Sequence, residues 1–337
     1  MKNIIKLFVV SILLLSHTLS YSQTSGYKVL EKVGVAGDGK WDFLTFDETS
    51  RNLYISHGSK MQVLNIDTKK IVGVVENTPG IHGITIVPEL NKGYTSNGKD
   101  STVTVFDIVS YKMIKRIKLQ AQSPDHIIYD TFSKKVFVFN NKSSNASVID
   151  PVKDIVVHTI ELKGKPELSV SDNNGTIYVN LEDKNEIAVI DAKTFLVKAR
   201  WTLGSGTEPT GLAIDIKGKR LFSGCSNKLL IVLNLETGKV ITTSPIGEGV
   251  DGVVFNSTEK LIFTSNGDSG TVTIIKQESQ DTYAVLENVS TAKGAKTIAF
   301  DQKKNTVYVS SAEFTTPTDG SKPTIVPNTF GIFVISK

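Results

Sequence analysis

Short runs of alternating apolar and polar residues recur along this chain, a pattern typical of half-buried β-strands. One run in each repeat carries an aromatic residue two or three positions before a polar one, as in Tyr94-Thr-Ser-Asn97. Seven aromatic residues occupy this position: Tyr54, Tyr94, Phe137, Tyr178, Phe222, Phe263 and Tyr308. Their spacing of 40 to 45 residues predicts seven copies of one supersecondary unit, which is the signature of a blade array.

Each repeat reads as four strands, called A to D in chain order. Strand A is a short apolar run, and a turn rich in Asp, Asn, Gly and Lys joins it to strand B, which carries the aromatic residue. This turn chemistry favours a hairpin. Strand C ends in an aspartate in four repeats, and we expect that carboxylate to cap the turn into strand D. The four aspartates are Asp67, Asp107, Asp150 and Asp191.

The two ends of the repeat array complement each other. The last repeat stops after a strand C at residues 331–336, whereas residues 27–33 alternate like a strand D that no strand A to C precedes. Pairing these two segments completes the seventh blade and leaves no open sheet edge. The sequence therefore predicts an all-β, seven-bladed β-propeller of four-stranded blades, closed by the N-terminal strand. The rival interpretation is an open solenoid with two frayed ends.

The N-terminus has the features of a secretory signal peptide. Lys2 and Lys6 precede an apolar run at residues 7–15, and Ser20 and Ser22 fit a cleavage site before Gln23. We therefore expect residues 1–22 to be removed, residues 23–337 to form a single propeller domain, and the protein to be periplasmic or secreted. The alternative is a retained N-terminal anchor.

Charge and cysteine content narrow the function classes. The net charge of +4 falls to +2 without the two N-terminal lysines, which argues against nucleic acid as a partner. No later segment stays apolar for 18 residues, so we expect a soluble mature chain with no membrane span. The single cysteine, Cys225, excludes an internal disulfide, and we expect it to be a packed residue.

Candidate binding residues gather at one predicted rim. Because strands in a blade are antiparallel, strand A begins at the same rim where strand B ends. Strand A of the first repeat begins near Asp42, and the corresponding positions elsewhere are rich in histidine and carboxylates. The predicted ligand-binding residues are His57, His82, Asp125, His126, Glu167, Asp251, Lys296 and Glu313. The alternative is that polar residues simply line a water-filled channel mouth.

Neither a cofactor nor a metal ligand is assigned from the sequence, although imidazole and carboxylate groups suit divalent metals. A long segment, residues 312–329, carries Pro317, Pro323 and Pro327 and emerges at the same rim. It is either a lid over the channel mouth or a proline-stiffened surface loop.

The repeat itself resembles a known family. Tyr94-Thr-Ser-Asn97, Phe137-Val-Phe-Asn140 and Tyr308-Val-Ser-Ser311 look like the "YVTN" repeat of YncE-like bacterial seven-bladed β-propellers. The resemblance covers residues 27–337 and implies a closed propeller exported to the periplasm, without an established enzymatic role. His57, Leu181 and Cys225 depart from the asparagine that usually ends this repeat.

No catalytic motif stands out in the sequence. We therefore expect an exported propeller that acts as a binding or scaffold module, with a small molecule or a protein as its partner at the channel mouth. The alternative is a metal-assisted enzyme, similar to lactonases or lyases, that uses the same His/Asp/Glu ring.

Overall fold

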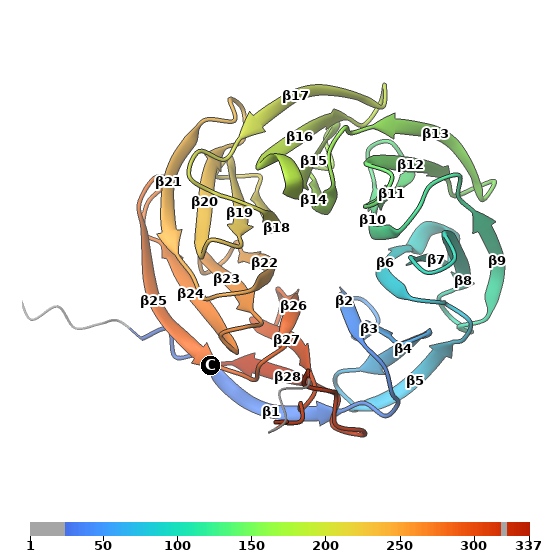
Figure 1. Cartoon of the computed structure of the whole chain (residues 1–337), viewed down its shortest axis with the longest axis horizontal. Coiled ribbons are helices and arrows are strands. Elements are labelled where there is room, and N and C mark those ends of the chain that lie inside the picture. Colours follow the sequence, from blue (N-terminus) through green and yellow to red (C-terminus); the bar gives the residue numbers. More distant parts are fainter. Residues whose placement is uncertain (1–23, 318–321) are drawn as a thin grey trace, which may run out of the picture.

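The computed structural model describes residues 24–317 and 322–337, so the predicted signal peptide lies outside the described residues. Seven four-stranded antiparallel sheets surround a central axis as the blades of a propeller (Figure 1). Within the described residues the only helical segments are two 3₁₀ turns, η1 (Pro88–Leu90) and η2 (Glu182–Lys184). No helix among these residues has the length and hydropathy needed to cross a membrane.

Each blade runs from an innermost to an outermost strand in the order A to D. The innermost strands are β2 (Trp41–Asp47), β6 (Ile81–Val87), β10 (Pro124–Asp130), β14 (Pro166–Ser171), β18 (Pro209–Asp215), β22 (Val250–Asn256) and β26 (Lys296–Asp301). The second strands are β3 (Asn52–His57), β7 (Lys92–Asn97), β11 (Lys135–Asn140), β15 (Thr176–Leu181), β19 (Arg220–Cys225), β23 (Leu261–Asn266) and β27 (Thr306–Ser311).

The outer half of each blade follows the same plan. The third strands are β4 (Lys60–Asn65), β8 (Thr102–Asp107), β12 (Asn145–Asp150), β16 (Glu186–Asp191), β20 (Leu229–Asn234), β24 (Thr271–Gln277) and β28 (Gly331–Ser336). The outermost strands are β5 (Lys70–Val75), β9 (Met113–Lys118), β13 (Ile155–Glu161), β17 (Leu196–Thr202), β21 (Val240–Pro245), β25 (Tyr283–Ser290) and β1 (Lys28–Gly34).

The N-terminal strand closes the ring, as predicted. Strand β1 pairs antiparallel with β28, from Lys28 opposite Ser336 to Gly34 opposite Gly331. The seventh blade thus has the strand order β1-β28-β27-β26 and combines both ends of the array. This pairing confirms the closed seven-bladed propeller and excludes the open solenoid.

The aromatic residues of the repeat anchor the core. All seven lie in second strands and are at most 4% exposed. They pack in clusters shared by neighbouring blades: Tyr54 of the first blade lies with Ile81, Ile84 and Phe106 of the second. Burial of each large apolar side chain stabilises the fold by about 1.5–3 kcal/mol. These contacts therefore stabilise the packing of each blade against its neighbour.

The predicted turn caps are present in three of the four aspartate positions. The carboxylate of Asp107 accepts hydrogen bonds from the backbone amides of Val109 and Ser110, and Asp150 and Asp191 act in the same way. In the first blade the prediction was wrong, because β4 ends two residues earlier than expected. Asn65 caps that turn through Thr68, and the Asp67 carboxylate instead pairs with Arg51.

Candidate functional site

A β-bulge marks the start of every innermost strand. The register between the first and second strands slips there in all seven blades, so more residues lie on the inner strand than opposite it. In the first blade the slip falls between Trp41 and Leu44, and Asp42 lies inside it. Bulges re-aim side chains and are frequent next to functional sites. Here they bring side chains from successive blades toward one another at one end of the propeller axis.

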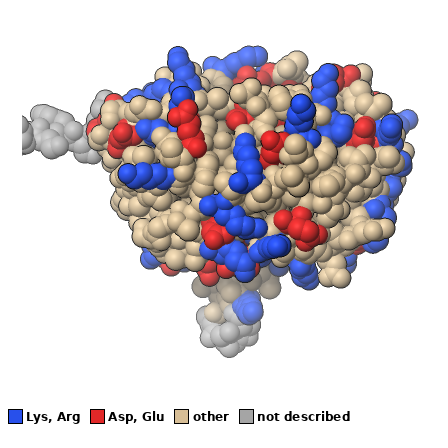
Figure 2. All heavy atoms as spheres, turned by 90° about the horizontal axis from the view of Figure 1, so that it is seen from above, with Lys and Arg blue, Asp and Glu red and all other residues tan. Residues whose placement is uncertain are grey.

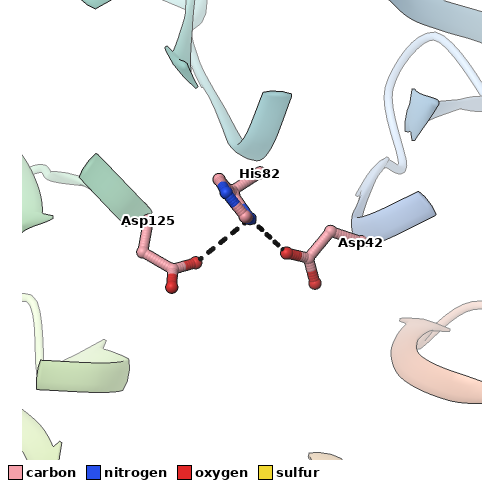
Figure 3. A group of neighbouring side chains, drawn as sticks. All are labelled: Asp42, His82 and Asp125. Atoms are coloured by element: carbon pink, nitrogen blue, oxygen red, sulfur yellow. Dashed lines mark hydrogen bonds and ion pairs between the residues drawn. The ribbon is translucent and has the colours of Figure 1, made fainter. Parts of the chain in front are cut away.

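Three of these side chains converge in the first three blades. Nδ1 of His82 on β6 lies 2.5 Å from Oδ2 of Asp42 on β2 and 3.7 Å from Oδ1 of Asp125 on β10 (Figure 3). The imidazole therefore sits between two carboxylates, and one potential ligand atom from each residue lies within 4.8 Å of the others. We call Asp42, His82 and Asp125 the carboxylate–histidine cluster.

The charged contacts continue into the last two blades. Nζ of Lys296 on β26 lies 3.7 Å from Oδ1 of Asp42 and 3.3 Å from Oδ2 of Asp251 on β22. Five residues from five successive blades thus form a chain in which acidic and basic groups alternate, from Asp251 to Asp125. Their side chains are 16–39% exposed, so the chain is partly open to solvent. We call these five residues the mouth ring.

Glu167 stands beside the mouth ring without touching it. Its carboxylate accepts a hydrogen bond from Nδ2 of Asn141 at 2.9 Å and pairs with Nζ of Lys165 at 3.2 Å. Burial raises the pKa of Glu167, although Lys165 partly opposes this effect. The fourth blade therefore adds another carboxylate close enough to Asp251 and Asp42 for their charges to raise its pKa further.

The electrostatics of the cluster differentiate its two carboxylates. Burial acts to raise the pKa of Asp42, but the charge of Lys296 and the hydrogen bond from His82 outweigh it and lower that pKa. Burial, followed by the charge of Asp42, raises the pKa of Asp125 to about 8. Burial also opposes the protonation of His82, but its carboxylate neighbours raise its pKa. The pKa values of the two carboxylates are therefore shifted in opposite directions, that of Asp42 downward and that of Asp125 upward.

His126 has a different role from His82. Its Nδ1 accepts a hydrogen bond from the backbone amide of Ser169 at 3.1 Å, which places its ring proton on Nε2. Its ring lies 4.9 Å from that of Phe43, a contact between the third and first blades. Burial lowers the pKa of His126 to about 4. It is thus a neutral histidine packed within the ring of inner strands.

His57 lies outside the mouth ring. It is 1% exposed, its ring lies 4.1 Å from that of Phe330, and burial lowers its pKa. Nε2 of Gln62 donates to Ala36, so Oε1 of Gln62 accepts from Nδ1 of His57 at 2.8 Å. Asn140 occupies the corresponding place in the third blade and bonds Asn145, also five residues ahead. His57 therefore replaces a structural asparagine.

Glu313 is exposed at the base of the long segment of the seventh blade. That segment begins and ends as a hairpin, because Phe314 pairs with Ile325 and the Glu313 carbonyl accepts the amide of Val326 at 2.8 Å. The described part of the loop lies near β28 and β1 in Figure 1, and Figure 2 shows basic and acidic side chains interspersed over the visible face of the molecule. A lid role for it stays a prediction. Cys225 is fully buried, and burial raises its pKa to about 12, which suits a packed thiol.

Sequence reasoning missed two members of this arrangement. Asp42 was placed at the rim but not among the ligand-binding residues, although it contacts both His82 and Lys296. Gly98 was not considered at all. A Cβ atom at position 98 would lie 2.6 Å from Nε2 of His82, so the glycine provides the space that the imidazole occupies. Its place directly after the second strand was the only available signal.

Comparison with known proteins finds partial sequence similarity to two curated proteins. No family model matches the chain. It is 25% identical over 193 residues to the uncharacterized protein YncE of Salmonella typhi and to that of Salmonella typhimurium (strain LT2), an alignment that covers 55% of this chain and 54% of each relative. The chain thus matches about half the length of these curated relatives.

A solved structure of Kuenenia stuttgartiensis hydrazine synthase is also similar. The comparison has a TM-score of 0.71 at 18% sequence identity and covers 82% of this chain and 94% of that one. At this identity the likeness shows the fold alone. The seven closed blades make this chain a seven-bladed β-propeller, and it is similar in sequence to YncE over about half of its length.

Proposed function

We propose that this protein is an exported binding module whose ligand, a small molecule or a group on a protein, binds at the mouth ring. Residues 1–22 act as the signal peptide in this proposal, and residues 23–337 work in the periplasm or outside the cell. The observation that carries the proposal is the alternating chain of charges from Asp251 to Asp125, built by five blades at one opening.

The arrangement suits binding because rigid strands position partly exposed charges. Partial burial makes unmatched charge costly, and the opening holds more carboxylates than basic groups. Asp42, Asp125, Asp251 and Glu167 face two basic side chains of the ring, Lys296 and His82, while Lys165 pairs with Glu167. A ligand with a positive charge or several hydrogen-bond donors would balance this excess.

The proposal can be tested by thermal denaturation in the presence of a ligand panel. The panel contains polyamines, arginine, amino sugars, dicarboxylates and divalent cations. The proteins are the wild type, an Asp42→Asn/Asp251→Asn double variant, and Asp191→Asn as a control. An asparagine at position 191 should preserve the turn, because Asn234 caps the equivalent turn of the fifth blade. A compound that stabilises wild type and control but not the double variant supports the proposal; stabilisation of all three alike places binding elsewhere and refutes it.

A metal-assisted enzyme similar to lactonases or lyases is the second candidate for the same face. The observation in its favour is the grouping of two carboxylates and one imidazole in the carboxylate–histidine cluster. A metal with an open coordination position polarises carbonyl groups and activates water. Hydrolysis of simple lactones by wild type, measured against His82→Gln, tests this candidate. Equal rates in the two proteins would exclude it.

A further inference from the structure

We propose that Asp42, His82 and Asp125 bind one divalent transition-metal ion, for which Zn²⁺ is the probe. The inference rests on the proposed function and deepens it by naming the ligand class of the mouth ring. Its basis is the convergence of three ligand types on one point from three successive blades (Figure 3).

The spacing of the three residues suits a common ion. Zinc bonds to imidazole nitrogen and carboxylate oxygen are about 2.0–2.2 Å long, so ligands of one ion lie within about 4.4 Å of one another. Nδ1 of His82 is 2.5 Å from the Asp42 carboxylate and 3.7 Å from that of Asp125, and all three atoms lie within 4.8 Å. Coordination of one ion by all three residues requires the short contact between His82 and Asp42 to open and the widest separation in the cluster to close slightly.

The imidazole is already oriented for this role. Its Nε2 edge lies against Gly98, where a Cβ atom would approach it to 2.6 Å. Its Nδ1 atom therefore faces the two carboxylates. Nδ1 is the ring nitrogen that would bind a metal. Ligands held by rigid elements lose little freedom on binding, which favours affinity.

The ligand set favours a transition metal over calcium. Calcium takes six to eight oxygen ligands, whereas this cluster offers two carboxylates and one nitrogen. Three protein ligands of this kind match zinc sites that leave a fourth position open to water or a bound molecule. The cluster is partly exposed, so such a position would be accessible from solvent.

The surrounding charges both favour and limit the ion. Lys296 lies 3.7 Å from Asp42 and opposes a second cation there. Asp125 has no basic partner other than His82 within the described ion pairs. A divalent ion between the two carboxylates would contact Asp125 directly, whereas Lys296 forms its described ion pairs with Asp42 and Asp251.

Isothermal titration with Zn²⁺ tests the proposal. The purified protein is stripped with a chelator and titrated beside His82→Gln, Asp125→Asn and the controls His158→Gln and Asp191→Asn. His158 is an exposed histidine on β13, the outermost strand of the third blade, whereas Asp125 lies on β10, the innermost strand of that blade. We expect one equivalent of Zn²⁺ in the wild type and both controls, and at least tenfold weaker binding in the two cluster variants. The circular dichroism spectrum of each variant is compared with that of the wild type to check that the variant is folded.

Two outcomes would overturn the inference: no zinc binding by the wild type, or equal affinity in His82→Gln. Substitution with Co²⁺ adds an independent check, because a site of nitrogen and oxygen ligands gives weak visible bands without the strong charge-transfer absorption of a thiolate. The experiments distinguish a wrong metal site from a wrong proposed function. If Zn²⁺ does not bind but an organic ligand stabilises wild type and not the Asp42→Asn/Asp251→Asn variant, the binding module stands and the metal site falls.

Discussion

Substitution of Gly98 by alanine tests the metal site without removing a ligand. The new Cβ atom would lie 2.6 Å from Nε2 and 2.8 Å from Cδ2 of His82, whereas ordinary contacts begin at about 3.4 Å. The backbone at position 98 is not in the left-handed region, so alanine introduces no local strain there. The imidazole is the group that must move, because it is a side chain facing a partly open ring.

The required displacement sets the size of the effect. The contact must lengthen by about 0.8 Å, so the imidazole can no longer keep the position in which its Nδ1 lies 2.5 Å from Asp42 and 3.7 Å from Asp125. Mutation of groups that orient a metal ligand costs about 10- to 100-fold in affinity. We therefore expect Gly98→Ala to weaken Zn²⁺ binding by about 10- to 100-fold, with little change in the free energy of unfolding.

The matched control is Gly267→Ala. Gly267 follows the second strand of the sixth blade as Gly98 follows that of the second, but a Cβ atom there meets its nearest neighbour, Cβ of Lys296, at 3.4 Å. This control should bind Zn²⁺ like the wild type in the same titration. Wild-type affinity in Gly98→Ala, or equal weakening in both variants, would refute the argument that Gly98 positions His82.

Three further predictions follow from the contacts described. Lys296→Met should tighten Zn²⁺ binding by about tenfold at low salt. Removing a charge a few ångströms from Asp42 changes the electrostatic energy of a bound cation by about 1–4 kcal/mol, and 1.4 kcal/mol corresponds to a factor of ten in affinity. Unchanged affinity in the titration would contradict this prediction. Tyr94→Phe removes the 2.7 Å hydrogen bond to Asp154 and should lower the free energy of unfolding by about 1.5–3 kcal/mol in urea titrations; a stability equal to wild type would show that water replaces the hydroxyl. Burial lowers the pKa of His57, so its contribution to stability is present above the unfolded pKa near 6.5 and is lost as the pH falls. The wild type should lose up to about 2 kcal/mol relative to His57→Asn between pH 7 and pH 5, and parallel urea curves for the two proteins would argue against a buried neutral imidazole.

The fold was predictable because its signals are local and repeated. Strand alternation and the aromatic of each second strand placed the blades, and the end segments predicted the pairing of β1 with β28. One turn was misread for a physical reason. Asn65 and Asp67 both suit a cap in sequence, and only the length of β4 decides between them.

The site was predictable only in part. Blade topology placed His82, Asp125, Asp251 and Lys296 at one rim, and the structure brings them together with Asp42. The seven bulges depend on strand pairing, so the sequence did not reveal which side chains would touch. The burial of His57 was accessible in principle, because it occupies the position of a repeated asparagine whose side chain bonds within its own blade.

The closure of the ring has a consequence for the biogenesis of the site. The hydroxyl of Thr297 donates to the carbonyl of Asp42 at 2.7 Å across 255 positions of sequence, and the mouth ring bridges the same junction through Lys296 and Asp42. Contacts between such distant segments form late, since chain entropy opposes them until most of the fold is in place. A nascent chain that lacks its last blade would therefore present only fragments of the ring. Ligand affinity at this face would then report that translation and folding have both reached completion.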